Sequence, residues 1–368
     1  MLFIKKNFKT ITLLVIFVLV VVVASAVSFN DKVGWATFAM PNNIRTLFMN
    51  MTSSGVMMVG MACLLMSGSI DLSTDSQAIL GTVMFVNLIK ALPSVPWGFL
   101  FAMSCVLMVA IALLHSFLTN VLGFMPFIAT IGTSSIYTGL ASVWTKAADV
   151  AFSRPSFQAL SKLDLKLFTF TTGTGREMTF VIPFLFLVTA FIIIVYALML
   201  TQTQFGRKIY LVGGNMQAAR LAGINPKKIS TALMINNSIL ALVGGLMWVL
   251  RNNKASITMS MSMPSMGGMT AAILGGVSFM GGGATGLGGA FVGLLLINTF
   301  TFSLEYYPGL NSQKWDWLQI MLGGLILVIA LVFDTLSSRG QMKKLLEARR
   351  KIVVESAEAG KARLAKGV

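Results

Sequence analysis

Residues 203–225 read TQFGRKIYLVGGNMQAARLAGIN and lie between two strongly apolar blocks. We expect a loop, then a turn at 213–215, and then a short helix that stops at Gly223. Asn215 suits the N-cap of that helix, because its side chain can accept hydrogen bonds from the free amides of the next turn. Gly223 suits the position after the helix, where a positive φ is needed. Such a helix is a rigid peg on which another protein can dock, and a plain charged loop is the alternative.

The composition places the chain among membrane proteins. Of its 368 residues 56% are hydrophobic and 11% are charged, and the mean hydropathy is +0.82, far above that of a soluble domain. The net charge of +16 would fit nucleic acid, but in a membrane protein it more often reflects Lys and Arg kept on the cytoplasmic side. We expect a lipid bilayer around the chain and no nucleic acid partner. With His115 as the single histidine, we also expect no metal site and no cofactor.

We predict an all-α fold, a polytopic bundle of about ten transmembrane helices of about 20 residues each, with one helix broken. The eighth apolar segment is rich in Met, Ser and Gly, and a break is tolerated only where protein or water covers the backbone. The predicted spans are 11–29, 44–66, 78–92, 97–117, 125–145, 178–200, 229–250, 257–276, 286–304 and 317–334.

An even number of spans puts both termini on one side of the membrane. Residues 24–26 have the form of a signal-peptide cleavage site, but further spans follow and we expect an uncleaved first helix. Basic residues near the span ends favour N- and C-termini in the cytoplasm. We divide the chain into a transmembrane domain, 1–336, and a cytoplasmic basic helical tail, 337–368, close to anionic lipid.

Two polar motifs adjoin the spans. Residues 67–73 (SGSIDLS) close the second span, and we expect Asp71 or Ser73 to cap the third span rather than to contact a solute. Residues 125–133 (MPFIATIGT) open the fifth span with Pro126 in its first turn. The hydroxyls and amides within the spans suit a path for a hydroxyl-bearing solute, and contact between helices is the alternative. The candidate pathway residues are Asn50, Thr130, Thr133, Ser134, Asn236 and Asn237.

Residues 271–286 read AAILGGVSFMGGGATG. Gly281, Gly283 and Gly286 fit G-x-G-x-x-G, and Glu305 follows at nearly the dinucleotide-binding spacing. We reject that interpretation, because no strand precedes the glycines and the helix after them is a membrane span. The glycines instead favour close approach of backbones at a helix break, which we place at Gly275, Gly276, Gly281 and Gly282.

These motifs resemble, in order, those of ABC-type sugar permeases of the ribose, xylose and galactoside group. The resemblance covers residues 44–334 and rests on the Gly-Ile-Asp-Leu-Ser, Pro-Phe-Ile-Ala-Thr-x-Gly-Thr and Leu-Gly-Gly-x-Ser signatures. The chain departs from the family at Asp75, where the family motif has glycine, and at Ser265 and Gly267, which replace an acidic pair. Residues that match the family's ATPase-coupling loop are Gly206, Arg207, Gly213, Gly214, Asn215, Ala218, Ala219, Gly223 and Ile224.

The resemblance implies the permease subunit of an ATP-driven importer for a sugar or sugar-like solute in a bacterial cell membrane. It implies three partners: a cytoplasmic ABC ATPase, an extracytoplasmic solute-binding protein, and a second permease copy or homologue. The sequence holds no G-x-x-x-x-G-K-[ST] loop to cradle ATP. The expected role is therefore transport and not enzymatic catalysis, with energy received at residues 203–225.

Two other classes of function remain as alternatives. An ion-coupled secondary transporter normally needs carboxylates or another ion site within the membrane, whereas the acidic residues near the spans all lie at span ends. A membrane-embedded enzyme needs a convergent nucleophile, base or metal cluster, and we identify no catalytic residues. The acidic residues concerned are Asp71, Asp75, Glu305 and Asp334.

Overall fold

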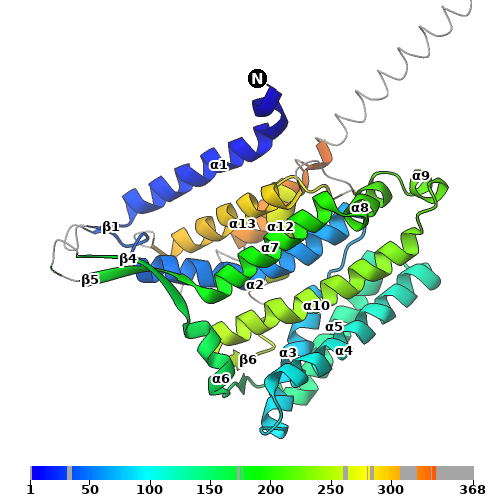
Figure 1. Cartoon of the computed structure of the whole chain (residues 1–368), viewed down its shortest axis with the longest axis horizontal. Helices are drawn as coiled ribbons and strands as arrows, with labels where there is room; N and C mark the ends of the chain where they lie inside the picture. Colours follow the sequence, from blue (N-terminus) through cyan, green and yellow to red (C-terminus); the bar gives the residue numbers. More distant parts are fainter. Residues whose placement is uncertain are drawn as a thin grey trace, which may run out of the picture.

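The computed structural model is a bundle of long helices that run side by side (Figure 1). It describes residues 2–30, 35–171, 175, 177–259, 264–279, 281, 286–306, 321–332 and 334–336. The predicted tail at 337–368 and Gly282 lie outside the described residues. The helices of the bundle are α1 (Leu2–Val27), α2 (Pro41–Met66), α3 (Thr74–Ala91), α4 (Trp97–Ser116), α5 (Pro126–Thr145), α7 (Phe184–Gln202), α10 (Pro226–Asn252), α12 (Pro264–Leu274) and α13 (Gly286–Ser303).

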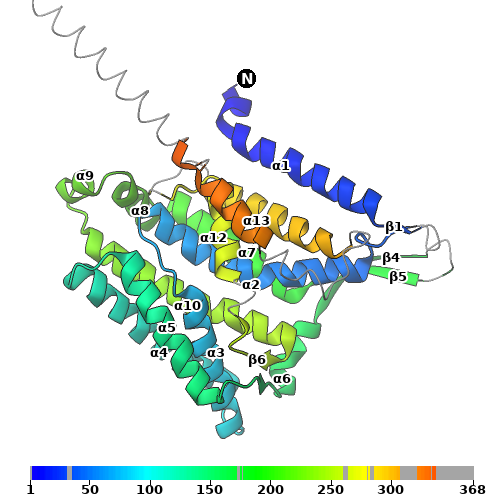
Figure 2. The same ribbon diagram turned by 180° about the vertical axis from the view of Figure 1, so that it is seen from behind.

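Short elements close the two ends of this bundle. Figures 1 and 2 show α8 (Gln204–Gly214) and α9 (Met216–Leu221) at one end, and α6 (Pro155–Gln158) with the hairpin of β4 (Asp164–Thr171) and β5 (Glu177–Pro183) at the other. A π-helical turn, η1 (Phe117–Val121), extends α4, and 3-10 turns form η2 (Ala159–Lys162) and η3 (Leu304–Tyr306). Two further antiparallel pairs join β1 (Phe29–Asn30) to β2 (Trp35–Ala36), and β3 (Val150–Ala151) to β6 (Lys254–Ala255).

Among the residues that the structure describes, six helices are long and apolar enough to cross a membrane. Residues 321–332 and 334–336 are also helical but form a shorter apolar stretch. An α-helical membrane protein is therefore the architecture. The six are Thr10–Val27, Pro41–Met66, Trp97–Val121, Phe184–Gln202, Pro226–Asn252 and Gly286–Tyr306.

Helix α2 is the centre of the bundle. It packs against α7, α10, α12 and α13, and every residue in 51–66 is buried. This stretch contains five methionines, whose unbranched side chains fill irregular gaps between helices. The outer helices α4, α5 and α7 instead expose large apolar side chains, as helices facing lipid do.

Two predictions for residues 178–214 are wrong, one about where a span starts and one about a loop. The sixth span starts at Phe184 and not at 178, because residues 177–183 pair with β4 as a strand. Residues 204–214 are the helix α8 and not a loop. Its apolar residues Phe205, Ile209 and Val212 recur at helical spacing, although the glycines and basic residues between them suggested a loop.

Ion pairs fasten the loops at the end of the bundle that holds the hairpin. Arg45 of α2 donates from Nε to Asp164 Oδ2 at 2.9 Å and from its NH2 group to the Ser161 carbonyl at 3.0 Å. Lys254 Nζ lies 2.5 Å from Asp149 Oδ2. Hydrogen bonds from Lys254 and from Ser256 lower the pKa of Asp149, so this carboxylate stays charged at neutral pH.

Candidate functional site

Helices α8 and α9 form a rigid step between α7 and α10. Thr203 begins α8, because its Oγ1 accepts from the Gly206 amide at 3.2 Å. Gly206 also brings α8 onto the end of α7: a Cβ there would lie 2.3 Å from the Leu200 carbonyl oxygen. With Ile209 and Val212 buried below it, α8 is fixed against α7 by backbone contact as well as by apolar burial.

The structure confirms both predicted caps of α9. Asn215 Oδ1 accepts from the amides of Gln217 and Ala218, each at 3.0 Å. At the other end Gly223 has φ +77°, and the Ile224 amide donates to the Ala219 carbonyl at 3.0 Å. This is the left-handed Schellman ending, in which glycine avoids the strain of a Cβ.

The outward surface of this step is basic, and the apolar side chains of Leu211, Met216 and Leu221 are exposed on it. Residues 203–228 contain no acidic side chain, and Leu221 is 92% exposed at the end of α9. We call this surface the α8–α9 step. Among the nine predicted coupling residues, Arg207, Gly214, Asn215, Ala218 and Gly223 are exposed on it, Gly213 and Ile224 are half-buried, and Gly206 and Ala219 are buried. Its exposed basic residues are Arg207, Lys208, Arg220, Lys227 and Lys228.

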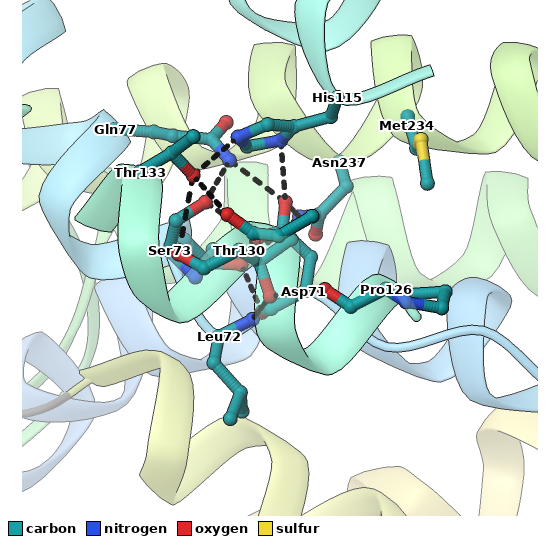
Figure 3. A network of polar contacts seen from close by, with 12 residues as sticks. Asp71, Leu72, Ser73, Gln77, His115, Pro126, Thr130, Thr133, Met234 and Asn237 are labelled. Carbon is teal, nitrogen blue, oxygen red and sulfur yellow. Dashed lines mark hydrogen bonds and ion pairs between the residues drawn. The ribbon is translucent and has the colours of Figure 1, made fainter. Parts of the chain in front are cut away.

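A second polar centre lies inside the bundle around Asp71, which is 1% exposed (Figure 3). Its Oδ1 accepts from the amide and the hydroxyl of Ser73 at 2.9 and 2.6 Å. Its Oδ2 accepts from Gln77 Nε2 of α3 at 2.7 Å and from Asn237 Nδ2 of α10 at 3.0 Å. His115 Nδ1 of α4 lies 3.8 Å from the same oxygen. Donors from α3, from α10 and from Ser73 before α3 therefore surround one carboxylate, and His115 of α4 lies near it without a hydrogen bond from Nδ1.

His115 extends the network to α5. Its Nε2 lies 2.8 Å from Thr133 Oγ1 and 3.0 Å from the Tyr137 hydroxyl. Thr130 Oγ1, one turn earlier on α5, accepts from the Leu72 amide at 3.1 Å beside Asp71. The Asp71 network, by which we mean these residues with Ser73, Gln77 and Asn237, thus joins α3, α4, α5 and α10.

The Asp71 network corrects two expectations. Asp71 lies at a span end in the sequence, but α3, α4 and α10 enclose it, so its position no longer argues against a charge at membrane depth. The expected side-chain cap of α3 is absent, because neither Asp71 nor Ser73 accepts from a backbone amide of that helix; Asp71 instead accepts the amide of Ser73, the residue just before it. The carboxylate in addition holds other helices, which the cap interpretation did not include.

The six predicted pathway residues separate into two groups. Thr130, Thr133 and Asn237 belong to the Asp71 network. Ser134 pairs with Ser76 of α3 at 2.6 Å, and Asn236 accepts a hydrogen bond from Tyr196. In the described part of the chain, Asn50 Oδ1, Asn236 Nδ2 and Asn237 Oδ1 have no hydrogen-bond partner.

Helix α12 has 11 residues and ends directly before Gly275. The Gly276 amide donates to the Ile273 carbonyl and the Val277 amide to the Ala272 carbonyl, each at 3.0 Å, and Gly276 has φ +103°. Gly275 packs on α13, since a Cβ there would lie 2.3 Å from the Ala290 amide nitrogen. The predicted break residues Gly275 and Gly276 thus form the end of α12, and Gly281 lies further along the same segment.

The two departures from the family motifs are in contact. Ser265 at the N-terminus of α12 donates its amide to Asp75 Oδ1 at 3.0 Å and its hydroxyl to Asp75 Oδ2 at 2.7 Å. Asp75 belongs to α3. A carboxylate near the positive end of a helix is favourable, so α3 supplies here the charge that α12 itself lacks.

Sequence reasoning did not single out Tyr137 as a partner of His115. A signal was present, because Thr130, Thr133 and Tyr137 are spaced by three and four residues and share one face of α5. Nothing in the sequence paired that face with α4, since the contact joins residues 22 positions apart on two helices.

Comparison with known proteins identifies the family. Residues 43–331 match the model of a protein family that is described as "Branched-chain amino acid transport system / permease component". The chain belongs to this family. No solved structure matches it.

Three proteins similar to this permease are named as sugar transport components. It is 23% identical over 342 residues to the galactose/methyl galactoside import permease protein MglC of Haemophilus influenzae, covering 90% of this chain and 94% of the relative. It is 28% identical over 297 residues to the L-arabinose ABC transporter permease protein AraH of Azospirillum brasilense, covering 81% of each. The ribose import permease protein RbsC of Bacillus subtilis is 25% identical over 298 residues, covering 81% and 86%. The chain is therefore a multi-pass membrane transport subunit and not an enzyme.

Asp71→Asn tests the network as a stabilising centre of the permease. The variant replaces one acceptor oxygen by a donor among the donors of Ser73, Gln77 and Asn237. We expect the free energy of unfolding in detergent to fall by roughly 2–3 kcal/mol, the cost of a lost hydrogen bond to a charged group. The control Asp149→Asn removes an exposed ion pair and should cost less than about 1 kcal/mol. Equal thermal stability of Asp71→Asn and wild type would contradict the role.

Asp75→Gly tests the contact in which a carboxylate of α3 accepts hydrogen bonds from the N-terminus of α12. Loss of this cap should lower stability by roughly 0.5–2 kcal/mol, measured by thermal unfolding of the purified permease. The exchange variant Asp75→Gly with Ser265→Asp places the carboxylate on α12 and should regain most of the loss. An exchange variant no more stable than Asp75→Gly would show that the contact is not a matter of charge at this helix end.

Proposed function

We propose that this permease forms the membrane pathway of an ATP-driven importer for a sugar or sugar-like solute. The relatives support the solute class, because three permeases similar to it are named for galactose, arabinose and ribose. The α8–α9 step is the observation that carries the coupling part of the proposal. It is rigid, basic and exposed, and it projects from one end of the bundle (Figure 1).

In this proposal a cytoplasmic ABC ATPase binds the α8–α9 step. The exposed Leu221 would enter an apolar pocket of that partner, and the surrounding basic residues would face acidic ones. Gly206 contacts Leu200 through the backbone. A force on the α8–α9 step would therefore move α7 as well, because no flexible side chain lies between the two helices to absorb the displacement. ATP-driven movement of the partner would then rock the bundle between its outward- and inward-facing states.

The same proposal sets the topology. With the α8–α9 step in the cytoplasm of a bacterial cell, about ten spans put both termini and the 337–368 tail on that side. The end with the β4–β5 hairpin then meets an extracytoplasmic solute-binding protein, and a second permease copy or homologue completes the pathway. The half-buried Asn50, Ser134 and Asn236 remain our candidates for contact with a hydroxyl-bearing solute, together with the buried Thr130, Thr133 and Asn237.

One observation favours a second candidate, an ion-coupled secondary transporter. Asp71 and His115 are 1% and 0% exposed within the bundle, and buried ionisable residues in membranes often mark ion paths. The donors around Asp71 favour a structural role instead, because they already satisfy the carboxylate. Uptake that stops when the proton gradient is collapsed at constant ATP would support the second candidate and count against ATP coupling.

Arg207→Glu and Gly223→Pro test the α8–α9 step. The first reverses a charge on it, and the second cannot adopt the φ of +77° found at Gly223. We expect both variants to reach the membrane, and uptake of labelled D-galactose, L-arabinose or D-ribose per ATP hydrolysed to fall about tenfold, the effect of losing ~1.4 kcal/mol of interaction.

The control is Lys162→Glu, which reverses an exposed charge at the opposite end of the bundle and should leave the ratio of uptake to hydrolysis unchanged. Normal transport by both step variants would remove the α8–α9 step from the mechanism. Labelling of Arg207→Cys from the outer face of intact cells would do the same, since no cytoplasmic motor could reach it.

A further inference from the structure

The segment after α12 passes between two other parts of the chain at Gly281. A Cβ at Gly281 would lie 2.7 Å from the Gly213 carbonyl oxygen of α8 and 3.2 Å from the Gly68 Cα. Gly281 also has φ +97°, a conformation that residues with a side chain avoid. We call Gly68, Gly213 and Gly281 the glycine junction. At this point three backbones meet without a side chain between them.

Gly68 connects the junction to the Asp71 network. It ends α2 with φ +77°, and the Ser69 amide donates to the Leu64 carbonyl at 3.0 Å. Asp71 follows three residues later. A shift of Gly68 therefore acts on a short connection whose far end is held by hydrogen bonds to α3 and α10.

The broken segment is itself held from a third direction. Asp334, which is 6% exposed, accepts from the Phe279 amide at 3.0 Å and from the Ser278 hydroxyl at 3.2 Å. Gly275 at the start of the segment packs on the α13 backbone. Of the residues after α12 that the structure describes, Gly275 is thus held by α13, Ser278 and Phe279 by Asp334, and Gly281 by the glycine junction.

We infer that Gly281 is a positioning residue that transmits movement of α8 to the α12 break and to the α2–α3 connection. Backbone contacts are stiff, because no side-chain rotamer can absorb a displacement, and close-packed interiors pass strain on. The inference rests on the proposed function, in which an ATPase moves the α8–α9 step. It adds the route inside the permease: Gly213 pushes on Gly281, and Gly281 bears on Gly68.

Gly281→Ala tests the route, because the added methyl group meets the Gly213 carbonyl. The readout is the rate at which a membrane-impermeant maleimide modifies Ser69→Cys, beside Gly68, in a background lacking Cys63 and Cys105. It is measured in vesicles containing the permease and its ATPase, with and without ATP and vanadate. We expect nucleotide to change this rate at least twofold in the Gly281 parent. Gly281→Ala should abolish the change while the ATPase still co-purifies and hydrolyses ATP.

Two controls separate the junction from general effects of alanine. Gly175→Ala has the same left-handed strain, with φ +78°, at the hairpin end of the bundle. Gly288→Ala lies on α13. For both, no heavy atom of the described residues lies within 4 Å of the new Cβ, and both should keep the nucleotide-dependent change in labelling.

Three results would overturn the inference. The first is an unchanged nucleotide response in Gly281→Ala, and the second is a parent whose Ser69→Cys labelling ignores nucleotide. The third is loss of ATPase binding in Gly281→Ala, which would make the junction a support for docking. If Gly281→Ala does not accumulate in the membrane, Asp334→Ala is the deciding variant, because it removes the hydrogen bonds to Ser278 and Phe279 without adding atoms. Loss of the nucleotide-dependent change in Ser69→Cys labelling in this variant supports the route. A full change in labelling overturns it. Failure of the proposed function is seen separately, as absence of ATPase binding to the parent.

Discussion

One carboxylate inside the bundle constrains how the helices around it are placed. A buried charge is tolerated only when hydrogen bonds replace its hydration, and Asp71 receives such bonds from Ser73, Gln77 and Asn237. These donors come from the α2–α3 connection, α3 and α10. A shift of any one of these three elements therefore breaks a hydrogen bond to the buried carboxylate. His115 adds α4 and, through Thr133 and Tyr137, α5. The permease thus has a polar centre whose geometry depends on several helices at once.

The need to satisfy buried polar groups with hydrogen bonds also applies at the ends of α12, the short helix before the break. Helix ends leave amides and carbonyls without partners, and in a membrane water does not supply them. At α12 the amide of Ser265 goes to Asp75, and the segment beyond the break gives the Phe279 amide to Asp334. Each carboxylate belongs to another helix. The N-terminus of this short helix is satisfied by a residue of α3, so the position of α12 depends on that of α3.

The sequence predicted those features whose causes are local. Asn215 and Gly223 were correctly identified as caps, because a cap depends on one side chain or one φ angle. The helix α8 was missed, since its glycines and basic residues resembled a loop and its helical spacing covers only three apolar residues. The contact of Asp75 with Ser265 joins residues 190 positions apart. Propensity and periodicity carry no information about such pairs; only the packing of α3 on α12 brings them together.

The distribution of polar contacts also separates what holds the permease together from what can carry motion. The Asp71 network is made of directional hydrogen bonds that resist displacement. The glycine junction is made of van der Waals contact between backbones, which resists compression but not separation. In the proposed route, a push from α8 at Gly213 would therefore reach Gly281, whereas a pull would not. Return movement must come from elsewhere, and the hydrogen bonds of Asp334 to Ser278 and Phe279 act in tension as well as compression. The backbone contact at Gly281 would transmit force in one direction, and the hydrogen bonds of Asp334 in both. This combination suits a transporter on which an ATPase pushes from the side of α8.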